Sequence, residues 1–329
     1  MDFGAIIGNC LRAAIGPEAA IFALAAIGLN LHYGYTGLLN FGQVGFMLMG
    51  TYGTAVSVVT WDLPLWLGVL IGLGAAVLLA LAMGLPTLRL RADYFAITTI
   101  AAAEILRFVV RSSSATDVTG GPFGLQGVAG DFYDLNVIPD GRYGTGTFVF
   151  SARTLWVMLV AWVLVALVTL ILARLVRSPW GRVITSIRED EDVARSLGKN
   201  VFSYKMQALV FGGVIGGLAG VMLAMSTSAA NANSFLPTVT FFAYTILFLG
   251  GAATRVGPII GAAIFWFVYG GSDSLLREMA SNDLLPDLLT SSGSIGAIRL
   301  VLVGLMLMAL MIFRPQGIFG DKRQMVLDA

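Results

Sequence analysis

Long apolar stretches alternate with short polar ones along the whole chain. A membrane-spanning helix needs about 20 mostly apolar residues, because a backbone in hydrocarbon must satisfy its own hydrogen bonds. Stretches of this kind lie at 18–33, 37–60, 64–85, 94–111, 153–176, 204–227, 238–253, 257–273 and 296–313. The pattern predicts an all-α polytopic membrane protein with about nine transmembrane helices, within a range of eight to ten. Residues 1–329 are expected to form a single transmembrane domain.

The segment before the first span lacks the basic start of a secretory signal peptide, so we expect it to remain in the mature chain. It is long enough for one further short or interfacial helix. Pro17 would mark its end, because proline interrupts a continuing helix.

Basic residues in the connections predict the orientation, since cytoplasmic loops carry an excess of Lys and Arg. With nine spans, four basic segments fall on one side of the membrane: 89–91, 174–205, 255 and 314–323. That side is then the cytoplasm, with the C-terminus inside and the N-terminus outside. The long connection 112–152 is expected to be an external loop. It carries four aspartates: Asp117, Asp131, Asp134 and Asp140.

Composition agrees with a membrane location and narrows the function. Only 12% of residues are charged, about half the usual share of a soluble domain, and mean hydropathy is +0.84. A net charge of +1 gives no bulk attraction for nucleic acid. One cysteine and one histidine leave no metal site of the His/Cys type, no intrachain disulfide and no catalytic triad. No G-x-x-x-x-G-K-[ST] loop occurs, so we expect no nucleotide bound in that way.

A dense group of charges interrupts this apolar chain at residues 178–205, called here the charged island. It holds nine of the 39 charged residues. Within it, 178–203 is predicted to be a cytoplasmic loop that contains a helix. Ser178 and Pro179 suit the start of this helix, and Gly198 suits its end.

The helix of the charged island is predicted to be amphipathic. Its apolar stripe consists of Ile184, Ile187, Ala194 and Leu197. Two i,i+4 ion pairs support it: Arg188 with Asp192, and Glu191 with Arg195. Two functions fit this pattern. The helix is either a solvated element that stabilises a loop or a docking helix whose stripe inserts into a groove of a cytoplasmic partner.

Few polar residues lie within the predicted spans, and such groups are functional candidates. Glu104 and Arg107 are spaced to neutralise each other, which favours a structural ion pair. Asn40 and Gln43 share a helical face, and we favour hydrogen bonding between helices over contact with a solute. His32 is expected to lie at the membrane interface rather than to bind a ligand.

Glycines recur at four-residue spacing in the span 204–227. Gly213 and Gly217 form one such pair, and Gly216 and Gly220 another. Small residues let helices approach closely in lipid, so we expect packing contacts here. Sliding surfaces for a conformational change are the alternative.

Several segments resemble one known family. Asp192-Val193-Ala194 followed by Gly198 resembles the EAA loop of ABC importer permeases, although that motif has Glu-Ala and a downstream Leu-Pro pair that are missing here. The stretch SPWGRVITSIREDEDVARSLGKNVFSYK is similar to the cytoplasmic loop of branched-chain amino-acid permeases. Five further segments resemble the same family in order: GLNLHYGYTGLLNFGQVGFMLMGTYG, YFAITTIAAAEILRFVV, TGGPFGL, LGGAATRVGPIIGAAI and FRPQGIFG. The chain is identified as a member of the branched-chain amino-acid ABC permease family, LivM type.

The resemblance implies a function that is not enzymatic. The chain would be the transmembrane permease of an ABC importer in the bacterial cytoplasmic membrane, moving branched-chain or other hydrophobic amino acids by alternating access. Its partners would be a homologous second permease, two cytoplasmic ATPases that hold ATP and Mg, an external substrate-binding protein and membrane lipid. The ATPase-coupling residues would be Arg188, Glu191, Asp192, Ala194, Leu197 and Gly198. The external docking candidates are Asp117, Asp131 and Asp134, with an ordinary polar loop as the alternative.

Other functions remain open at this point. A permease for urea or short amides belongs to the same class. An ion-coupled carrier or channel would need buried acidic sites or unwound helices at the midplane. Glu104 is the main candidate for such an acidic site. A membrane-anchored structural or signalling protein is a third class. Dependence of transport on ATPase partners separates the first class from the others.

Overall fold

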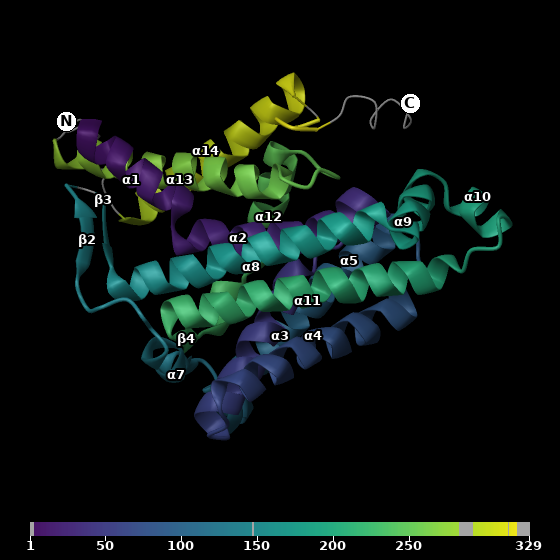
Figure 1. Ribbon diagram of the computed structural model, residues 1–329, viewed down its shortest axis with the longest axis horizontal. Helices are drawn as coiled ribbons and strands as arrows, with labels where there is room; N and C mark the ends of the chain where they lie inside the picture. The colour runs from purple at the N-terminus through teal and green to yellow at the C-terminus, as the bar shows by residue number, and fades with distance from the viewer. Residues whose placement is uncertain (1–2, 147, 283–291, 315, 321–329) are drawn as a thin grey trace.

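The computed structural model describes residues 3–146, 148–282, 292–314 and 316–320. They form a bundle of helices, most of which run along the long axis of the molecule (Figure 1). The bundle helices are α1 (Phe3–Ile15), α2 (Pro17–Leu29), α3 (Gln43–Ala55), α4 (Leu65–Thr87), α5 (Ala92–Arg111), α8 (Ala152–Arg177), α11 (Val201–Thr227), α12 (Pro237–Gly250), α13 (Gly257–Ser281) and α14 (Ser292–Phe313).

Shorter elements complete the fold. The short helices are α6 (Thr116–Thr119), α7 (Gly130–Asp134), α9 (Pro179–Glu189) and α10 (Glu191–Ser196). The π-helical turns are η1 (Asn30–Tyr35) and η2 (Val56–Thr60), and the 3-10 turns are η3 (Ser113–Ala115) and η4 (Ala232–Phe235). The strands are β1 (Leu125–Gln126), β2 (Arg142–Thr145), β3 (Phe148–Ser151) and β4 (Ala229–Ala230).

Each apolar stretch predicted as a span contains a helix, and the class of multi-pass membrane protein is confirmed. Among the residues that the structure describes, four helices are long and apolar enough to cross a bilayer alone: α4, α8, α11 and α13. The bent pair α1–α2 would add a fifth, while α3 and α12 are shorter. Residues 37–42 lie outside any helix, so the second predicted span is helical only from Gln43. The total of nine stays a prediction.

The first helix ends where the sequence predicts. Its last residue is Ile15, Pro17 opens α2, and the two axes meet at 41°. Proline suits the first turn of a helix because its missing N–H would have no partner there. Residues 3–15 therefore form the separate short helix that was expected before the first span.

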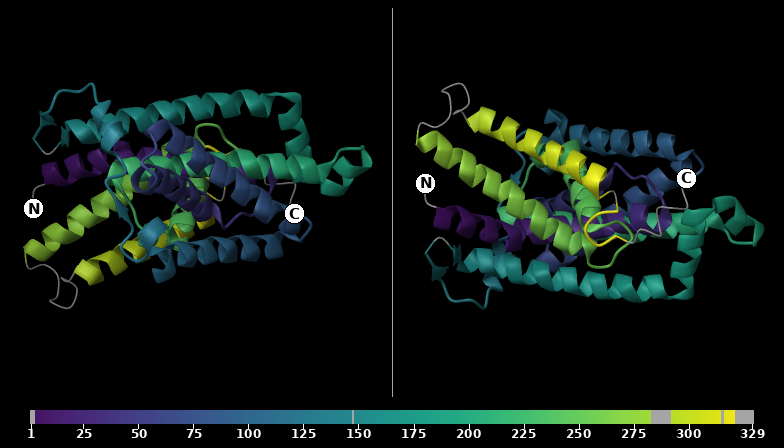
Figure 2. Two further views of the ribbon diagram at one scale, coloured as in Figure 1. Left: turned by 90° about the horizontal axis from the view of Figure 1, so that it is seen from below. Right: turned by 90° about the horizontal axis from the view of Figure 1, so that it is seen from above.

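The core of the bundle is α2. Every residue from Ala19 to Leu29 is buried, among neighbours on α8, α11, α12 and α13 (Figure 2). A helix that is apolar on all sides belongs inside a large protein or a membrane bundle. Its alanines keep it thin, which lets the surrounding helices approach.

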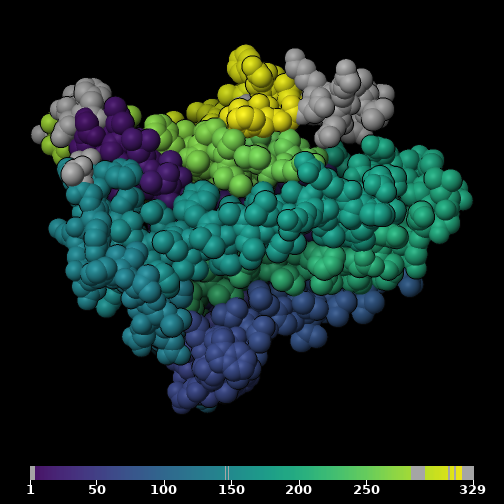
Figure 3. Space-filling view, in the orientation of Figure 1, coloured from purple at the N-terminus to yellow at the C-terminus, as the bar shows by residue number. Residues whose placement is uncertain are grey.

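The outer face of α8 shows what the bundle presents to lipid. This helix crosses the front of the molecule in Figure 3, and its exposed positions are apolar over several turns. They include Leu159, Val163, Leu167 and Leu170. An apolar band of this length is typical of a surface that contacts hydrocarbon.

Helices α3 and α11 meet through glycines. A Cβ atom added to Gly50 would clash with the carbonyl oxygen of Gly217. One added to Gly213 would lie 2.6 Å from the ring of Phe46, and one added to Gly217 would lie 2.9 Å from Cβ of Ala76. Close packing is therefore the role that the geometry supports for Gly213 and Gly217.

The two ends of the bundle carry different segments. At one end lie α6, α7 and two short antiparallel pairs, β1 with β4 and β2 with β3 (Figure 1). At the other end lie the connection 88–91 and helices α9 and α10. The connection 251–256 lies at the end of α12, where Ile318 and Phe319 donate to the carbonyls of Leu249 and Gly250. The predicted external loop and the charged island therefore lie at opposite ends, while the side that faces the cytoplasm stays a prediction.

A glycine-to-alanine pair tests the packing of α3 on α11. Gly50→Ala places a methyl group against backbone atoms, so we expect a loss of about 1–3 kcal/mol of stability, the usual cost of overpacking. Gly74→Ala is the matched control, because no atom lies within 4 Å of its added Cβ. Thermal midpoints in detergent should fall for Gly50→Ala alone. Equal midpoints for both variants would contradict the close contact.

Candidate functional site

The single helix that the sequence predicted in the charged island is two helices, α9 and α10, and residues 201–205 form the start of α11. Asp190 leaves helical geometry, with φ −155° and ψ 109°, and becomes the N-cap of α10. Its carboxylate accepts hydrogen bonds from the backbone N–H groups of Asp192 (2.9 Å) and Val193 (3.0 Å). Aspartate is among the strongest N-cap residues, and this signal was missed. Gly198, with φ +76°, lies at the expected end of the region.

The apolar stripe of the charged island faces the bundle. Ile184, Ile187 and Ala194 are buried, whereas Leu197 is 72% exposed. Val193, which the stripe did not include, is 55% exposed on α10, which ends just before Leu197. The exposed apolar surface of the charged island therefore consists of Val193 and Leu197, and the buried residues attach it to the bundle.

Ion pairs fix α10 in place. Arg195 bonds to Glu191 (2.9 Å), as the i,i+4 spacing predicted, and to Asp192 (3.0 Å). Glu191 also pairs with Lys205, which lies in the first turns of α11. The predicted pair between Arg188 and Asp192 does not form, because both side chains have other partners.

Arg188 connects α9 to the centre of the bundle. Its Nη1 donates to the carbonyl oxygen of Gly34 at 2.6 Å, across 154 residues of sequence. Gly34 lies near the end of η1, where carbonyls lack an onward helical partner. Gly37 has φ +73°, and a Cβ there would lie 3.3 Å from Cγ of Arg188. The charged island is thus anchored to the turn that ends α2.

A buried chain of polar side chains lies beneath this anchor. His32 is fully buried, with Nε2 3.1 Å from the carbonyl oxygen of Leu209 on α11 and Nδ1 3.0 Å from the side-chain nitrogen of Asn40. An imidazole protonated on Nε2 satisfies both bonds. Asn40 also bonds to Gln43 (3.4 Å), which donates to the carbonyl of Ala25 on α2 (3.2 Å).

The ring of His32 lies between the helices and points toward α11, so its membrane-interface location stays a prediction. Asn40 and Gln43 are both buried, and their bonds join α2, α3 and α11. Bonding between helices, rather than contact with a solute, is the role that this geometry supports.

Asn30 attaches a third segment to η1. Its amide donates to the carbonyl of Thr254 and accepts from the backbone N–H of Ala253, both at 2.8 Å. These residues belong to the connection 251–256 between α12 and α13. The turn η1 therefore holds the charged island, α11 and this connection together, through Gly34, His32 and Asn30.

Glu104 and Arg107 form the predicted ion pair on α5. The guanidinium donates from Nε to Oε2 at 2.9 Å and from Nη2 to Oε1 at 2.5 Å. The side chain of Arg107 is 6% exposed and that of Glu104 is 31% exposed. The guanidinium of Arg107 also lies over the ring of Phe108. The pair faces partly outward from the described bundle.

The three external docking candidates lie in short helices at the opposite end. Asp117 belongs to α6, and Asp131 and Asp134 belong to α7, all of them exposed. In the described ranges none of the three forms an ion pair. Tyr133 anchors α7, since its hydroxyl donates to the carbonyl of Met225 (2.8 Å), and burial raises the pKa of this hydroxyl.

Within the described part of the chain, no three His, Cys, Asp or Glu residues are grouped so that they could hold a metal ion. Fold and site together define a multi-pass membrane protein with a charged, helical connection at one end of its bundle.

Comparison with known proteins gives the family. Residues 14–312 match the family described as branched-chain amino acid transport system / permease component, and the chain belongs to this family. It is 31% identical over 319 residues to the high-affinity branched-chain amino acid permease LivM of Escherichia coli K12, covering 94% of this chain and 70% of that one. It is 24% identical to a probable LivM of Methanocaldococcus jannaschii (92% and 91% covered). It is 27% identical to LivH of Escherichia coli K12 (80% and 83% covered).

These relatives are transport permease subunits, a class without enzymatic activity of its own. The resemblance read from the sequence motifs is confirmed. The roles of individual residues in the charged island and the external loop stay predictions.

Mutation of the α5 ion pair tests whether it is structural. Glu104→Ala leaves the nearly buried guanidinium of Arg107 unpaired, and we expect a loss of about 1–3 kcal/mol. Adding Arg107→Leu removes the unpaired charge and should restore most of the thermal midpoint in detergent. A double variant less stable than Glu104→Ala alone would show that Arg107 has another essential partner.

Proposed function

We propose that the chain is the transmembrane permease subunit of a bacterial ABC importer for branched-chain or other hydrophobic amino acids. Family membership supports the transport of such a solute. The observation that carries the ABC mechanism is the charged island, which lies at one end of the bundle and is anchored by Arg188 to the turn ending the central helix. A surface helix that only stabilised a loop would not need this attachment.

The charged island would dock on a cytoplasmic ATPase through Val193 and Leu197. Both are exposed apolar side chains, Val193 on α10 and Leu197 directly after its last residue, and apolar anchors of this kind fill grooves in a partner. Ala194 and Gly198 maintain the shape of the surface, the first by packing against the bundle and the second through its positive φ. Glu191, Asp192 and Arg195 brace the helix between these points.

Two links would carry motion from the ATPase into the membrane. Arg188 bonds α9 to η1, and Glu191 pairs α10 with Lys205 on α11. Displacement of the charged island therefore pulls on the end of α2 and on α11 together. Alternating access is then a rocking of these helices, with ATP and Mg bound by two partner subunits.

The remaining partners follow from the two ends of the bundle and from the relatives. Resemblance to both LivM and LivH supports pairing with a second, homologous permease. The exposed aspartates of α6 and α7 would meet basic residues of an external substrate-binding protein. The chain would lie in the bacterial cytoplasmic membrane, with the charged island inside the cell and its apolar outer faces in lipid.

Other solutes and mechanisms fit less well. A permease for urea or short amides would use the same architecture, while the relatives favour amino acids. An ion-coupled carrier needs an ionisable group free to bind its ion. Glu104, the acidic candidate within the predicted spans, is already paired with Arg107. A structural or signalling role predicts no solute flux.

Affinity purification of the tagged chain from its own membranes in mild detergent tests the proposal. Mass spectrometry should find a second permease and two copies of an ATPase in fixed proportion. Recovery of the chain alone, still folded and able to move solute in liposomes, would overturn it.

Substitution of the exposed apolar pair tests the docking surface. Val193→Asp with Leu197→Asp removes the anchors from the interface and should reduce ATPase co-purification by tenfold or more, since buried apolar anchors contribute about 2 kcal/mol or more each. Leu135→Asp is the matched control, because Leu135 is 65% exposed at the opposite end. It should leave ATPase co-purification unchanged. Full ATPase recovery with the Val193/Leu197 variant would place the interface elsewhere.

Neutralising the external aspartates tests the binding-protein surface. The triple variant Asp117→Asn, Asp131→Asn and Asp134→Asn should weaken capture of the binding protein and reduce its dependence on salt, because rim charges act mainly on association. Asp93→Asn, at the other end of the bundle, is the control. Binding-protein capture that is unchanged in the triple variant would favour an ordinary polar loop.

A further inference from the structure

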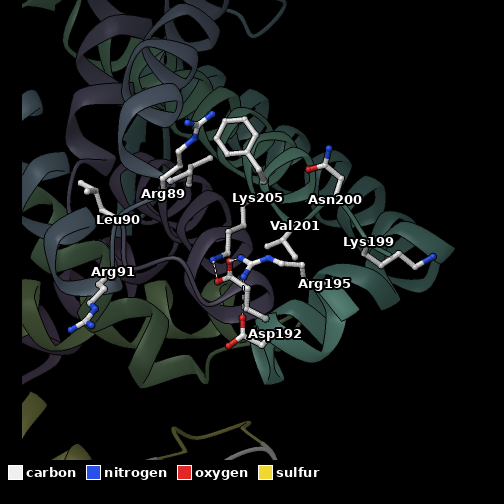
Figure 4. Close-up of a pocket in the computed structure, with 12 residues that line it drawn as sticks. Arg89, Leu90, Arg91, Asp192, Arg195, Lys199, Asn200, Val201 and Lys205 are labelled. Atoms are coloured by element: carbon white, nitrogen blue, oxygen red, sulfur yellow. Dashed lines mark hydrogen bonds and ion pairs between the residues drawn. The ribbon is translucent and has the colours of Figure 1, made fainter. Parts of the chain in front are cut away.

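A basic groove lies between the connection 88–91 and the start of α11. It has a volume of about 1000 Å³ (Figure 4). Five cations line it: Arg89, Arg91, Arg195, Lys199 and Lys205. Two carboxylates, Glu191 and Asp192, line it as well, so the groove has a surplus of three positive charges. Figure 4 places Arg89 and Arg91 on one side of the groove, and Arg195 and Lys199 toward the other.

Three side chains account for the surplus of positive charge in the groove. Arg195 and Lys205 are paired with the two carboxylates. In the described part of the chain, Arg89, Arg91 and Lys199 have no carboxylate partner. Arg89 is held over the ring of Phe202 at 5.6 Å, which fixes its position without neutralising its charge. Arg91 and Lys199 are exposed and lie on opposite sides of the groove in Figure 4.

An apolar face lies on α5, the helix that follows the connection 88–91. Leu90 lines the groove and is 45% exposed. Tyr94, Ile97, Ile105 and Phe108 follow at helical spacing along α5, each more than half exposed. Arginine and lysine at the end of an apolar helical face are typical of the bilayer surface, and so is a tyrosine at that level.

We propose that this groove binds the headgroup of an anionic phospholipid, whose acyl chains lie on the exposed face of α5. The phosphate would sit between Arg89, Arg91 and Lys199, which supply bidentate guanidinium donors and a mobile ammonium. Clusters of basic residues at the end of a membrane helix attract anionic lipid by this means. The site goes beyond the proposed transport function, since a bound lipid would hold α10 and α11 to the 88–91 connection.

A lipid fits these observations better than an acidic segment of a protein. An acidic protein segment would need only the charges. The groove instead includes the connection 88–91, which leads directly into α5 with its apolar exposed face, and a phospholipid likewise joins phosphate to hydrocarbon. Its volume of about 1000 Å³ also exceeds what a free phosphate ion requires.

Native mass spectrometry of the purified full chain tests the site. The chain is titrated with phosphatidylglycerol or with phosphatidylcholine of the same acyl chains, and bound lipids are counted. The triple variant Arg89→Gln, Arg91→Gln and Lys199→Gln should lower the preference for phosphatidylglycerol by about ten- to a hundredfold. This estimate assumes that each cation near a membrane surface contributes about fivefold to the affinity for anionic lipid. Arg89→Lys with Arg91→Lys keeps the charges and should retain most of the preference.

The matched control removes three cations from the opposite end: Arg111→Gln, Arg142→Gln and Arg153→Gln. Arg153 lies over Tyr133 at 5.4 Å, as Arg89 lies over Phe202, so both triple variants lose one stacked guanidinium. The control should keep the lipid preference, and thermal midpoints show that each variant is folded.

Three results would overturn the lipid site. An equal loss in both triple variants would show a bulk charge effect. Competition by glycerol 3-phosphate as effective as that of the lipid would indicate a site for a free anion. An unchanged lipid preference combined with lost ATPase co-purification would assign the groove to an acidic segment of that partner.

Discussion

The structure depends on how the central helix ends inside the bundle. Helix α2 is buried on all sides, so the backbone groups freed at its end must find partners away from water, where each unpaired group costs several kcal/mol. In the π-helical turn η1, the backbone N–H groups of Gly37 and Leu38 bond to the carbonyls of Tyr33 and His32, and Arg188 donates to the carbonyl of Gly34. The side chains of the same turn hold two other segments: His32 bonds to α11, and Asn30 bonds to the connection 251–256. The turn that ends the central helix thereby ties the charged island to the core.

This arrangement explains why a chain so apolar carries a dense group of charges. The charges of α9 and α10 are divided between internal bracing and an anchor, while the exposed surface of α10 offers apolar side chains to a partner. Because the anchor is a charge-assisted bond to a buried turn, the proposed movement of the charged island would be transmitted to α2 instead of being absorbed by a flexible loop. The basic groove proposed to bind lipid lies beside α10. The proposed coupling surface and the proposed lipid site thus share one end of the molecule.

Local patterns predicted much of this molecule, and long-range contacts account for what they missed. Apolar stretches placed the helices, Pro17 ended α1, and the spacing of Glu104 and Arg107 gave their ion pair. The break at Asp190 was missed because Ser178 and Gly198 suit the ends of one continuous helix, although an N-cap aspartate followed by acidic residues was readable. The bond from Arg188 to Gly34 and the burial of His32 could not be read, since both partners lie more than 150 residues away. No periodicity encodes such a contact.

The central claim is that solute crosses this chain only when ATPase partners move the charged island. The most direct measurement is uptake of radiolabelled leucine into liposomes that hold either the chain alone or its purified complex, with the binding protein supplied on the outside and ATP enclosed within. The account predicts uptake by the complex with ATP, and none by the complex without ATP or by the chain alone. Sustained uptake through the folded chain alone, independent of ATP, would contradict it.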